Sequence, residues 1–215
     1  MYLPNSFAER DLPTLFAFME AHPLATLVTT SPTGLFATHL PLILDRARGS
    51  VGTLFGHVAR ANPHSRYVTE GAPEALVIFT GPDAYITPEW YHTKQETRRV
   101  VPTWNYIAVH VYGRLQLRDD PAFLRPHLER LTRQHEHGRP TPWQVSDAPA
   151  DYIDQQLKAI VGVELEIARV EGKWKMSQNR SAADIDGVIR GLGDSEAIQD
   201  QIVAAIVRER RPVKP

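Results

Sequence analysis

One segment combines the residue types that bind a phosphate group. A predicted strand ends at His57 and Val58, a predicted helix begins at Asn62 and Pro63, and Arg60 lies between them. The free N–H groups and the positive dipole end of a helix's first turn attract anions, and an arginine adds a planar set of donors. The segment therefore predicts a phosphate site. An ordinary capped helix with a surface arginine is the alternative interpretation.

A second candidate is a strand that contains both a histidine and a proline. Its four residues are Thr38, His39, Leu40 and Pro41. Proline has no N–H to give to a sheet, so this pattern indicates an edge, a bulge or backbone groups that face a ligand. Such groups could bond the polar edge of a ring. An edge strand whose histidine is satisfied within the protein is the alternative.

Two aromatic clusters could stack on a flat ring. One is Trp90 with Tyr91, and the other is Trp104 with Tyr106, separated by Asn105. Most clusters of this kind belong to a core or to a dimer interface, and that interpretation stays open. Asn105 is informative because a core strand does not need an amide at this position.

Other kinds of site have little support. The pairs His135 with His137 and His57 with His64 lack helical i,i+4 spacing with a third ligand, so we predict no metal site. We also predict no catalytic residue, because only His39 and His57 are available as an acid or base. The chain has no cysteine, which excludes disulfides, thiolate-bound metals and thiol nucleophiles. Neither a glycine-rich dinucleotide motif nor a Walker loop is present.

Length and composition are typical of one large domain. The chain has 215 residues, of which 42% are hydrophobic, and its net charge of -1 gives no field that would attract nucleic acid non-specifically. The first residues lack a basic and then apolar leader, and no apolar run approaches the ~20 residues of a membrane span. We therefore expect a cytoplasmic protein.

The candidate residues need a framework of strands to position them. Strands are expected at residues 24–30, 35–44, 51–58, 74–88, 102–117 and 163–171. Helices are expected at residues 11–22, 62–70 and 151–157 and from residues 121, 181 and 194, and residues 173–180 are expected to be irregular. About six antiparallel strands with inserted helices predict an α+β barrel. Residues 1–180 would form the barrel domain, with residues 181–215 as a C-terminal helical extension packed on it.

Several blocks of the chain resemble the PaiB-type family, described as FMN-binding negative transcriptional regulators. The blocks are MYLP at residues 1–4, THLP at 38–41, GHVARANP at 56–63, GPDAYITPEWY at 81–91, VPTWNY at 101–106 and KMSQNR at 175–180. Their order along nearly the whole chain makes the resemblance more specific than any one block.

The resemblance implies the antiparallel split β-barrel, the FMN-binding split barrel, in a homodimer that holds FMN where the two barrels meet. The phosphate would be bound after the third strand, by Ala59, Arg60 and Asn62, with His57 beside them. The ring would lie on Thr38, His39, Leu40 and Pro41. A later strand, often from the partner chain, would add Trp104, Asn105 and Tyr106, and the segment with Gln178 and Arg180 would close over the edge.

The resemblance leaves more than one role open. A regulator or flavin sensor would change its association with DNA or with another protein, although no DNA-reading element is visible. A flavin-dependent oxidoreductase, such as a flavin reductase or a pyridoxamine-phosphate-oxidase-like enzyme, is the main alternative. The full basic cluster and the arginine-containing ending of those oxidases are absent. Haem handling is a third possibility, with histidines as axial ligands.

Overall fold

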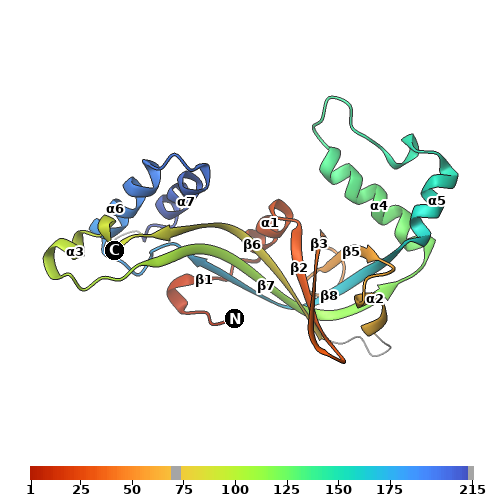
Figure 1. Cartoon of the computed structure of the whole chain (residues 1–215), viewed down its shortest axis with the longest axis horizontal. Coiled ribbons are helices and arrows are strands. Elements are labelled where there is room, and N and C mark those ends of the chain that lie inside the picture. The colour runs from red at the N-terminus through yellow and green to blue at the C-terminus, as the bar shows by residue number, and fades with distance from the viewer. Residues whose placement is uncertain (69–73, 213–215) are drawn as a thin grey trace. The chain divides into compact units, whose positions relative to one another are not determined.

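The computed structural model describes residues 1–68 and 74–212, and its framework is a sheet of eight strands (Figure 1). The strands follow the order β3-β2-β6-β7-β8-β5-β4 across the sheet, and β1 pairs with β8. The pairs β1–β8, β2–β3, β2–β6, β4–β5 and β5–β8 are antiparallel. The strands are β1 (Ala8–Glu9), β2 (Leu24–Ser31), β3 (Gly34–Pro41), β4 (Ile43–Asp45), β5 (Thr53–Ala59), β6 (Glu74–Ile86), β7 (Thr103–Arg118) and β8 (Ile160–Lys175).

Capping side chains determine where two of the helices begin. Asp120 accepts a hydrogen bond from the N–H of Ala122 at 2.9 Å, at the start of α4. Ser181 accepts one from the N–H of Asp184 at 3.2 Å, at the start of α6. Each cap satisfies an N–H group that has no partner inside the helix.

The helices are α1 (Leu12–Ala21), α2 (His64–Tyr67), α3 (His92–Thr97), α4 (Pro121–Glu136), α5 (Ala150–Lys158), α6 (Ala182–Gly193) and α7 (Ile198–Glu209). Single 3-10 turns are η1 (Asn5–Phe7), η2 (Pro88–Trp90) and η3 (Val145–Asp147). Over residues 1–68 and 74–212, none of these helices is long and apolar enough to cross a membrane.

The chain forms two compact units, each assembled from separate stretches of sequence. The first unit contains Met1–Leu15, Thr80–Val109 and Glu171–Pro215, and the second contains Phe16–Phe79 and His110–Val170. Strands β6, β7 and β8 each contribute residues to both units. The two units therefore divide within strands and not at a linker. The expected division at residues 180 and 181 stays a prediction, and α6 and α7 belong to the first unit.

The hairpin of β2 and β3 forms one wall of the second unit. Thr38 lies opposite Leu27, and His39 lies opposite Thr26. Because side chains alternate along a strand, these two pairs face opposite sides of the sheet. Leu27 is buried and His39 is exposed, so the Thr38 side is the inner one.

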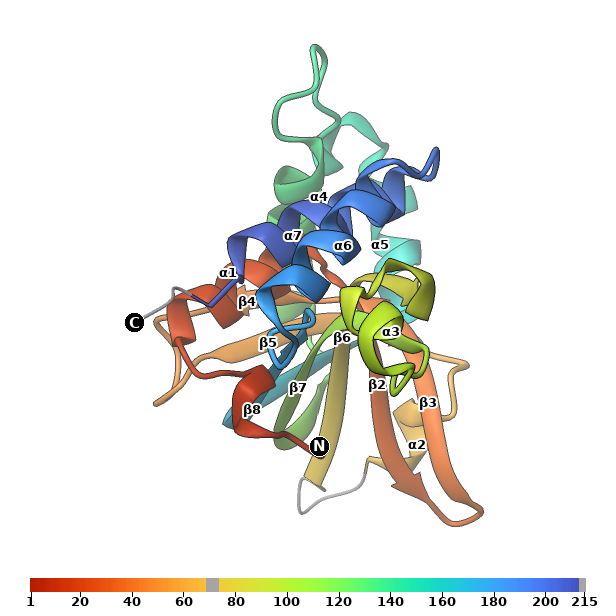
Figure 2. The same ribbon diagram turned by 90° about the vertical axis from the view of Figure 1, so that its left-hand side faces the viewer.

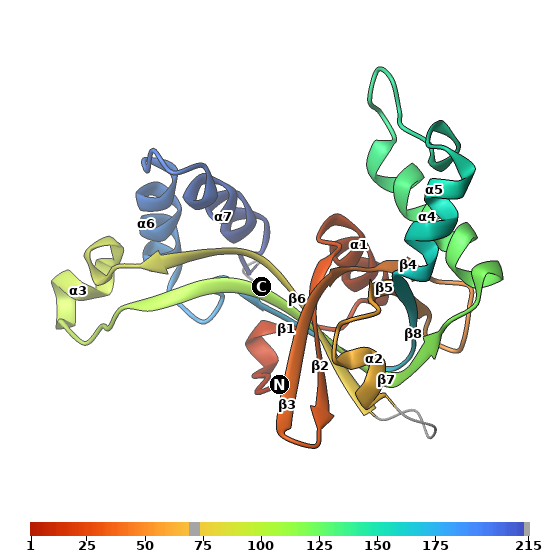
Figure 3. The ribbon, with the colours of Figure 1, turned by 45° about the vertical axis from the view of Figure 1, so that its right-hand side comes forward.

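A glycine lets the edge strand β3 approach β5 in the same unit (Figure 3). A Cβ atom on Gly56 would lie 2.7 Å from Cδ2 of Leu42 and 3.1 Å from the carbonyl oxygen of Pro41. Both distances are shorter than ordinary van der Waals contact, so any side chain at Gly56 would push the strands apart. Helices α4 and α5 and the turn η3 form a separate apolar cluster of this unit, made by Leu124, Val145, Ile153 and Leu157.

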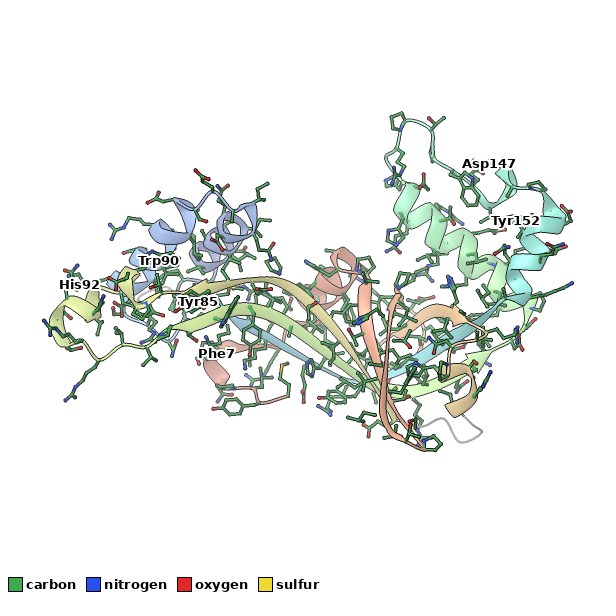
Figure 4. All side chains as sticks on the ribbon, in the orientation of Figure 1. Phe7, Tyr85, Trp90, His92, Asp147 and Tyr152 are labelled. Atoms are coloured by element: carbon green, nitrogen blue, oxygen red, sulfur yellow. The ribbon has the colours of Figure 1, made fainter. Side chains whose placement is uncertain are left out.

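In the first unit, β1 pairs with β8 through Ala8 and Lys173. Helices α6 and α7 lie side by side (Figures 1 and 2). Trp90 packs against α6 at two glycines, Gly187 and Gly191 (Figure 4). A Cβ at Gly187 would overlap the Trp90 carbonyl, and one at Gly191 would overlap its ring.

Most of the expected elements are present, and the differences have local causes. The strand expected at residues 35–44 is divided, because the N–H of Leu42 bonds to the carbonyl of Pro23 at 2.9 Å and leaves the sheet between β3 and β4. The edge position indicated by Pro41 is confirmed, since β3 ends the strand order.

Two segments near the chain's connections differ from the expected structure, and a third lies outside the described residues. The segment from Lys173, expected to be irregular, continues β8 as far as Lys175, and Lys173 pairs with Ala8 of β1. The last helix begins at Ile198 and not at residue 194. The expected end of the helix at Glu70 lies outside the described residues.

Candidate functional site

A hydrogen-bonded cluster in the second unit joins side chains from β3 and from the segment that follows β5. The Thr38 hydroxyl lies 2.7 Å from Nδ1 of His64, and Nδ2 of Asn62 donates to the Thr38 oxygen at 3.0 Å. Oδ1 of Asn62 accepts from the backbone N–H of His64 at 2.9 Å. The exposed Ala59 closes the turn, because its carbonyl accepts from the N–H of Asn62 at 2.8 Å. We call these three side chains the Thr38–Asn62–His64 cluster.

His64 carries a buried polar atom without a partner. The residue has an exposed fraction of 0%, and burial lowers the pKa of its imidazole, so the ring is neutral near pH 7. The Thr38 hydroxyl is closer to Nδ1 of His64 (2.7 Å) than to Oδ1 of Asn62 (3.4 Å), so we assign its hydrogen to the histidine. The neutral ring then has its own hydrogen on Nε2. No described residue accepts that hydrogen.

Arg60 is engaged within the protein. Its Nη1 and Nη2 donate to the two carboxylate oxygens of Asp119 at 2.7 and 2.5 Å. Its Nε donates to the carbonyl of Lys158 at 2.7 Å, and Nη2 also donates to the carbonyl of Ile160 at 3.0 Å. The hydrogen bonds between Arg60 and Asp119 raise the pKa of Arg60 and lower that of Asp119.

These contacts occupy four of the five guanidinium N–H groups. Arg60 thereby fastens the end of β5 to the start of β8 and to the end of β7. Its predicted contact with a phosphate remains a prediction, and it would require the single remaining N–H group or the release of Asp119.

The residues predicted to hold a ring do not share one face. Leu40 is buried on the same side as Thr38, whereas Nδ1 of His39 lies 2.9 Å from the Thr26 hydroxyl on the exposed side. Pro41 is half-buried at the end of β3. A ligand bound on the Thr38 face of β3 would therefore not reach the imidazole of His39, which lies on the opposite face.

The side chain of His57 lies against helix α4. Its Nδ1 is 3.1 Å from Nε2 of His127, whose ring stacks on Phe123 at an interplanar angle of 14°. Burial lowers the pKa of His57. Burial, followed by the charges of His57 and Arg130, lowers the pKa of His127 to about 4. The neutral pair links β5 to α4, and no hydrogen bond of the described residues connects His57 to the Thr38–Asn62–His64 cluster.

In the first unit, the ring of Trp104 is available for stacking. Trp104 is 53% exposed, and its ring centroid lies 5.8 Å from that of Tyr85. Tyr85, which is labelled in Figure 4, is 49% exposed. Tyr106 follows on the same side of β7, half-buried, with Nζ of Lys173 5.2 Å from its ring centroid. The rings of Trp104 and Tyr106 are therefore not fully covered by the protein, and their contact with a flat ligand or a second subunit stays a prediction.

Asn105 is paired inside the protein. It has an exposed fraction of 0%, and its Nδ2 donates to the Ser177 hydroxyl at 3.0 Å. The hydroxyl in turn lies 3.2 Å from Oδ1 of Asn105. Ser177 has a backbone φ of 63°, a left-handed conformation that side chains disfavour. The pair therefore holds the turn between β8 and α6 in place.

The same turn contains Gln178 and Arg180. Oε1 of Gln178 accepts from the N–H of Met176 at 2.7 Å, and its Nε2 donates to the carbonyl of Trp174 at 2.6 Å. Gln178 thus builds the turn. The Cζ atom of Arg180 lies 4.5 Å from the centroid of the Tyr91 ring.

The predicted site residues fall into two groups, one in each unit. The second unit contains Thr38, His39, Leu40, Pro41, His57, Ala59, Arg60 and Asn62, and the first unit contains Trp104, Asn105, Tyr106, Gln178 and Arg180. That one flavin contacts both groups stays a prediction. In the Thr38–Asn62–His64 cluster, the buried Nε2–H group of His64 has no acceptor among the described residues.

Two residues here were not among the predicted site residues: His64, a member of the cluster, and Arg66, close to it in the chain. His64 was considered only as a metal ligand, although its position two residues after a capping asparagine placed it in the predicted phosphate segment. Arg66 lies on the same one-turn helix, is exposed and forms no ion pair with a described residue. The sequence feature that could have identified Arg66 is its position close to Arg60, in the segment predicted to bind a phosphate.

Sequence comparison identifies related proteins over the whole length of the chain. Residues 1–169 match the protein family described as "Putative FMN-binding domain". An uncharacterized protein of Emericella nidulans is 36% identical over 248 residues, covering 100% of this chain and 99% of the relative. The protease synthase and sporulation protein PAI 2 of Bacillus subtilis is 31% identical over 210 residues, covering 98% of each chain.

Solved structures share the fold at low sequence identity. The flavocytochrome Anf3 of Azotobacter vinelandii has a TM-score of 0.56 and 18% identity, covering 78% of this chain and 69% of that one. An FAD and heme binding protein of Mycobacterium smegmatis has a TM-score of 0.56 and 19% identity, covering 78% of this chain and 73% of that one. The predicted fold class, an α+β antiparallel split β-barrel, is confirmed.

Proposed function

The chain belongs to the PaiB-type family of FMN-binding proteins, with FMN as the family's cofactor, and on this basis we propose that it is a cytoplasmic, homodimeric flavin sensor that acts as a regulator. Its similarity to a sporulation protein over the full length supports a regulatory role. The flavin would supply redox chemistry, and the protein would position it and respond to its state.

The buried N–H group of His64 is the observation on which the proposed binding mode depends. A buried donor without an acceptor costs about 1–3 kcal/mol, and a phosphate oxygen at Nε2 of His64 would remove that cost. Thr38 and Asn62 would hold the imidazole in the required orientation through their existing bonds. Arg66 would supply the positive charge that a phosphate needs.

In this proposal Arg60 is a positioning residue. Its bonds to Asp119 and to the carbonyls of Lys158 and Ile160 hold the segment that carries Asn62 and His64. Substitution of Arg60 would therefore lower FMN affinity by disturbing this segment, whether or not its remaining N–H group reaches the phosphate.

The exposed rings of Trp104 and Tyr85 support the homodimer. The two rings contact each other and remain about half exposed, so they offer an aromatic surface that a ligand or a second subunit would cover. We propose that Trp104 and Tyr106 contact the flavin or the second subunit. The predicted contributions of Asn105, Gln178 and Arg180 to the same site are part of this proposal.

A comparison of FMN with riboflavin tests the phosphate site. Flavin fluorescence quenching would measure both affinities in wild type and in the variants His64→Leu and Arg66→Gln. We expect the preference for FMN over riboflavin to fall by about tenfold in each variant, because each loses a charge-assisted or buried hydrogen bond. His39→Gln, on the exposed side of the same strand, should leave the preference unchanged. An equal preference in all four proteins would refute this site.

A second experiment separates the two roles. A regulator should shift a promoter fragment in a salt-sensitive and FMN-dependent manner. Rapid reduction of the bound flavin by a nicotinamide cofactor, with steady turnover of an electron acceptor and no DNA shift, would instead establish an oxidoreductase.

A further inference from the structure

A pocket of about 490 Å³ lies in the second unit, between α4 and the segment of chain that follows this helix. Residues 129, 132, 133 and 136 of α4 line one side, and residues 137–138 and 142–146 line the other. The four helix positions follow the spacing i, i+3, i+4 and i+7, so they form one face of α4. The volume is in the range of pockets that hold small molecules, about 300–1,000 Å³.

The segment opposite α4 is held in place at both ends. Gly138, directly after the helix, has a φ of 87°, a left-handed conformation that favours glycine and turns the chain back. The N–H of Trp143 donates to Oε2 of Glu136 at 3.1 Å, and the other oxygen of Glu136 pairs with Arg139 at 3.2 Å. Val145 is 7% exposed and packs in the apolar cluster of α4 and α5. The pocket is therefore preformed by the fold.

One part of the pocket wall is apolar and contains an aromatic ring. Trp143 is 46% exposed, and its neighbours Pro142 and Val145 also line the pocket. The face of a tryptophan ring is large and flat, and it stacks well on other aromatic groups. This wall fits the apolar part of a ligand, and a flat ring would fit it best.

The α4 side of the pocket carries one charge of each sign. Glu129 and Arg133 are four residues apart on the lining face, about 6 Å along the helix axis. Both are exposed, and neither forms an ion pair with another residue in the described part of the chain, whereas the adjacent Arg130 pairs with Asp45 at 3.2 Å. A ligand with one positive and one negative group would pair with both side chains, and a ligand with a single charge would pair with only one.

We propose that this pocket binds a small zwitterionic molecule with a flat apolar side group, of the chemical class of the aromatic amino acids. Arg133 would bind the carboxylate, Glu129 would bind the ammonium group, and the ring would lie against Trp143. The two charged groups of an amino acid are attached to one carbon atom, so side chains on adjacent turns of a helix can reach both. No lining residue belongs to the Thr38–Asn62–His64 cluster, so the proposal is independent of flavin binding.

Three ligands with the same ring test this assignment. They are phenylalanine, 2-phenylethylamine, which lacks the carboxylate, and 3-phenylpropanoate, which lacks the ammonium group. Calorimetric titration of the full-length, FMN-loaded protein measures the three affinities at pH 7.5. Phenylalanine should bind about threefold to tenfold more tightly than either analogue, because each analogue loses one charged hydrogen bond at a partly exposed side chain.

Variants of the lining residues assign each charge to its partner. Arg133→Gln should weaken phenylalanine by about threefold to tenfold and leave 2-phenylethylamine unchanged, since that ligand has no carboxylate. Glu129→Gln should weaken phenylalanine to a similar extent and leave 3-phenylpropanoate unchanged. Trp143→Ala should weaken all three ligands. Arg99→Gln and Glu196→Gln, exposed substitutions in the first unit, remove the same charges elsewhere and should bind as wild type does.

The outcomes that would overturn the proposal are distinct from a loss of folding. Glu129 and Arg133 are exposed, so both variants should keep the wild-type melting temperature. Wild type that binds none of the three ligands, or that binds 2-phenylethylamine as tightly as phenylalanine, would overturn the proposal. Wild-type affinity for phenylalanine in both charge variants would overturn it as well. His64→Leu should leave phenylalanine binding intact, so failure of the proposed flavin site would be seen separately.

Discussion

Mild acid should destabilise this protein through one buried histidine. His127 has its pKa lowered from 6.5 to about 4 by burial, by the neighbouring His57 and by Arg130. Well above pH 6.5 neither the folded nor the unfolded state holds a proton on this ring. As the pH falls, the His127 ring takes up a proton in the unfolded state near pH 6.5, but in the folded state only near pH 4. The stability contributed by His127 is therefore complete above pH 6.5 and is lost as the pH falls toward 4.

The expected loss follows from the difference between the two pKa values. Between pH 7.5 and pH 5 the free energy of unfolding should fall by about 2 kcal/mol from His127 alone, and by about 3 kcal/mol once the pH is below 4. His57 also has a lowered pKa and adds to the loss in the same direction. The two rings titrate as a coupled pair, so the measured midpoints belong to the pair.

Urea unfolding of wild type and of His127→Gln, at pH 7.5 and pH 5 and at one fixed FMN concentration, measures this loss. Glutamine can still donate to His57 but does not titrate, so this variant should lose about 2 kcal/mol less than wild type over the interval. His135→Gln, on the exposed side of the same helix, should behave as wild type. Equal losses in wild type and in His127→Gln would refute the reasoning.

Two further predictions concern packing and a buried hydrogen bond. Gly56→Ala should destabilise the protein by about 1–3 kcal/mol, because its Cβ would lie 2.7 Å from Cδ2 of Leu42. Gly193→Ala is the control, since a Cβ there meets open space and should leave the stability unchanged. Thermal unfolding measures the melting temperatures of both variants. Asn105→Ala should cost about 1–3 kcal/mol in urea unfolding, since it leaves the buried Ser177 hydroxyl without its partner, and a cost near zero would show that water replaces the amide.

Local patterns were good predictors of the framework. The alternation of apolar and polar residues predicted the strand at residues 102–117, and the capping residues Asp120 and Ser181 predicted where α4 and α6 begin. The proline in residues 38–41 correctly indicated an edge strand. These features depend on residues close together in the chain, which is why the sequence alone reveals them.

Contacts between residues far apart in the chain could not be predicted from local sequence patterns. Arg60 looked like a free phosphate donor because its pairing with Asp119, at the far end of β7, leaves no trace in the local pattern. His57 faces α4 for the same reason, since nothing near it indicates His127. The opposite orientation of Thr38 and His39 could have been predicted, because adjacent residues of any strand point to opposite sides.

The pairing of Ala8 with Lys173 has a consequence for the synthesis of this protein. Strand β1 is made well before β8, because seven helices and strands or more separate them in the chain. Its pairing edge therefore stays open to other chains until β8 has been translated.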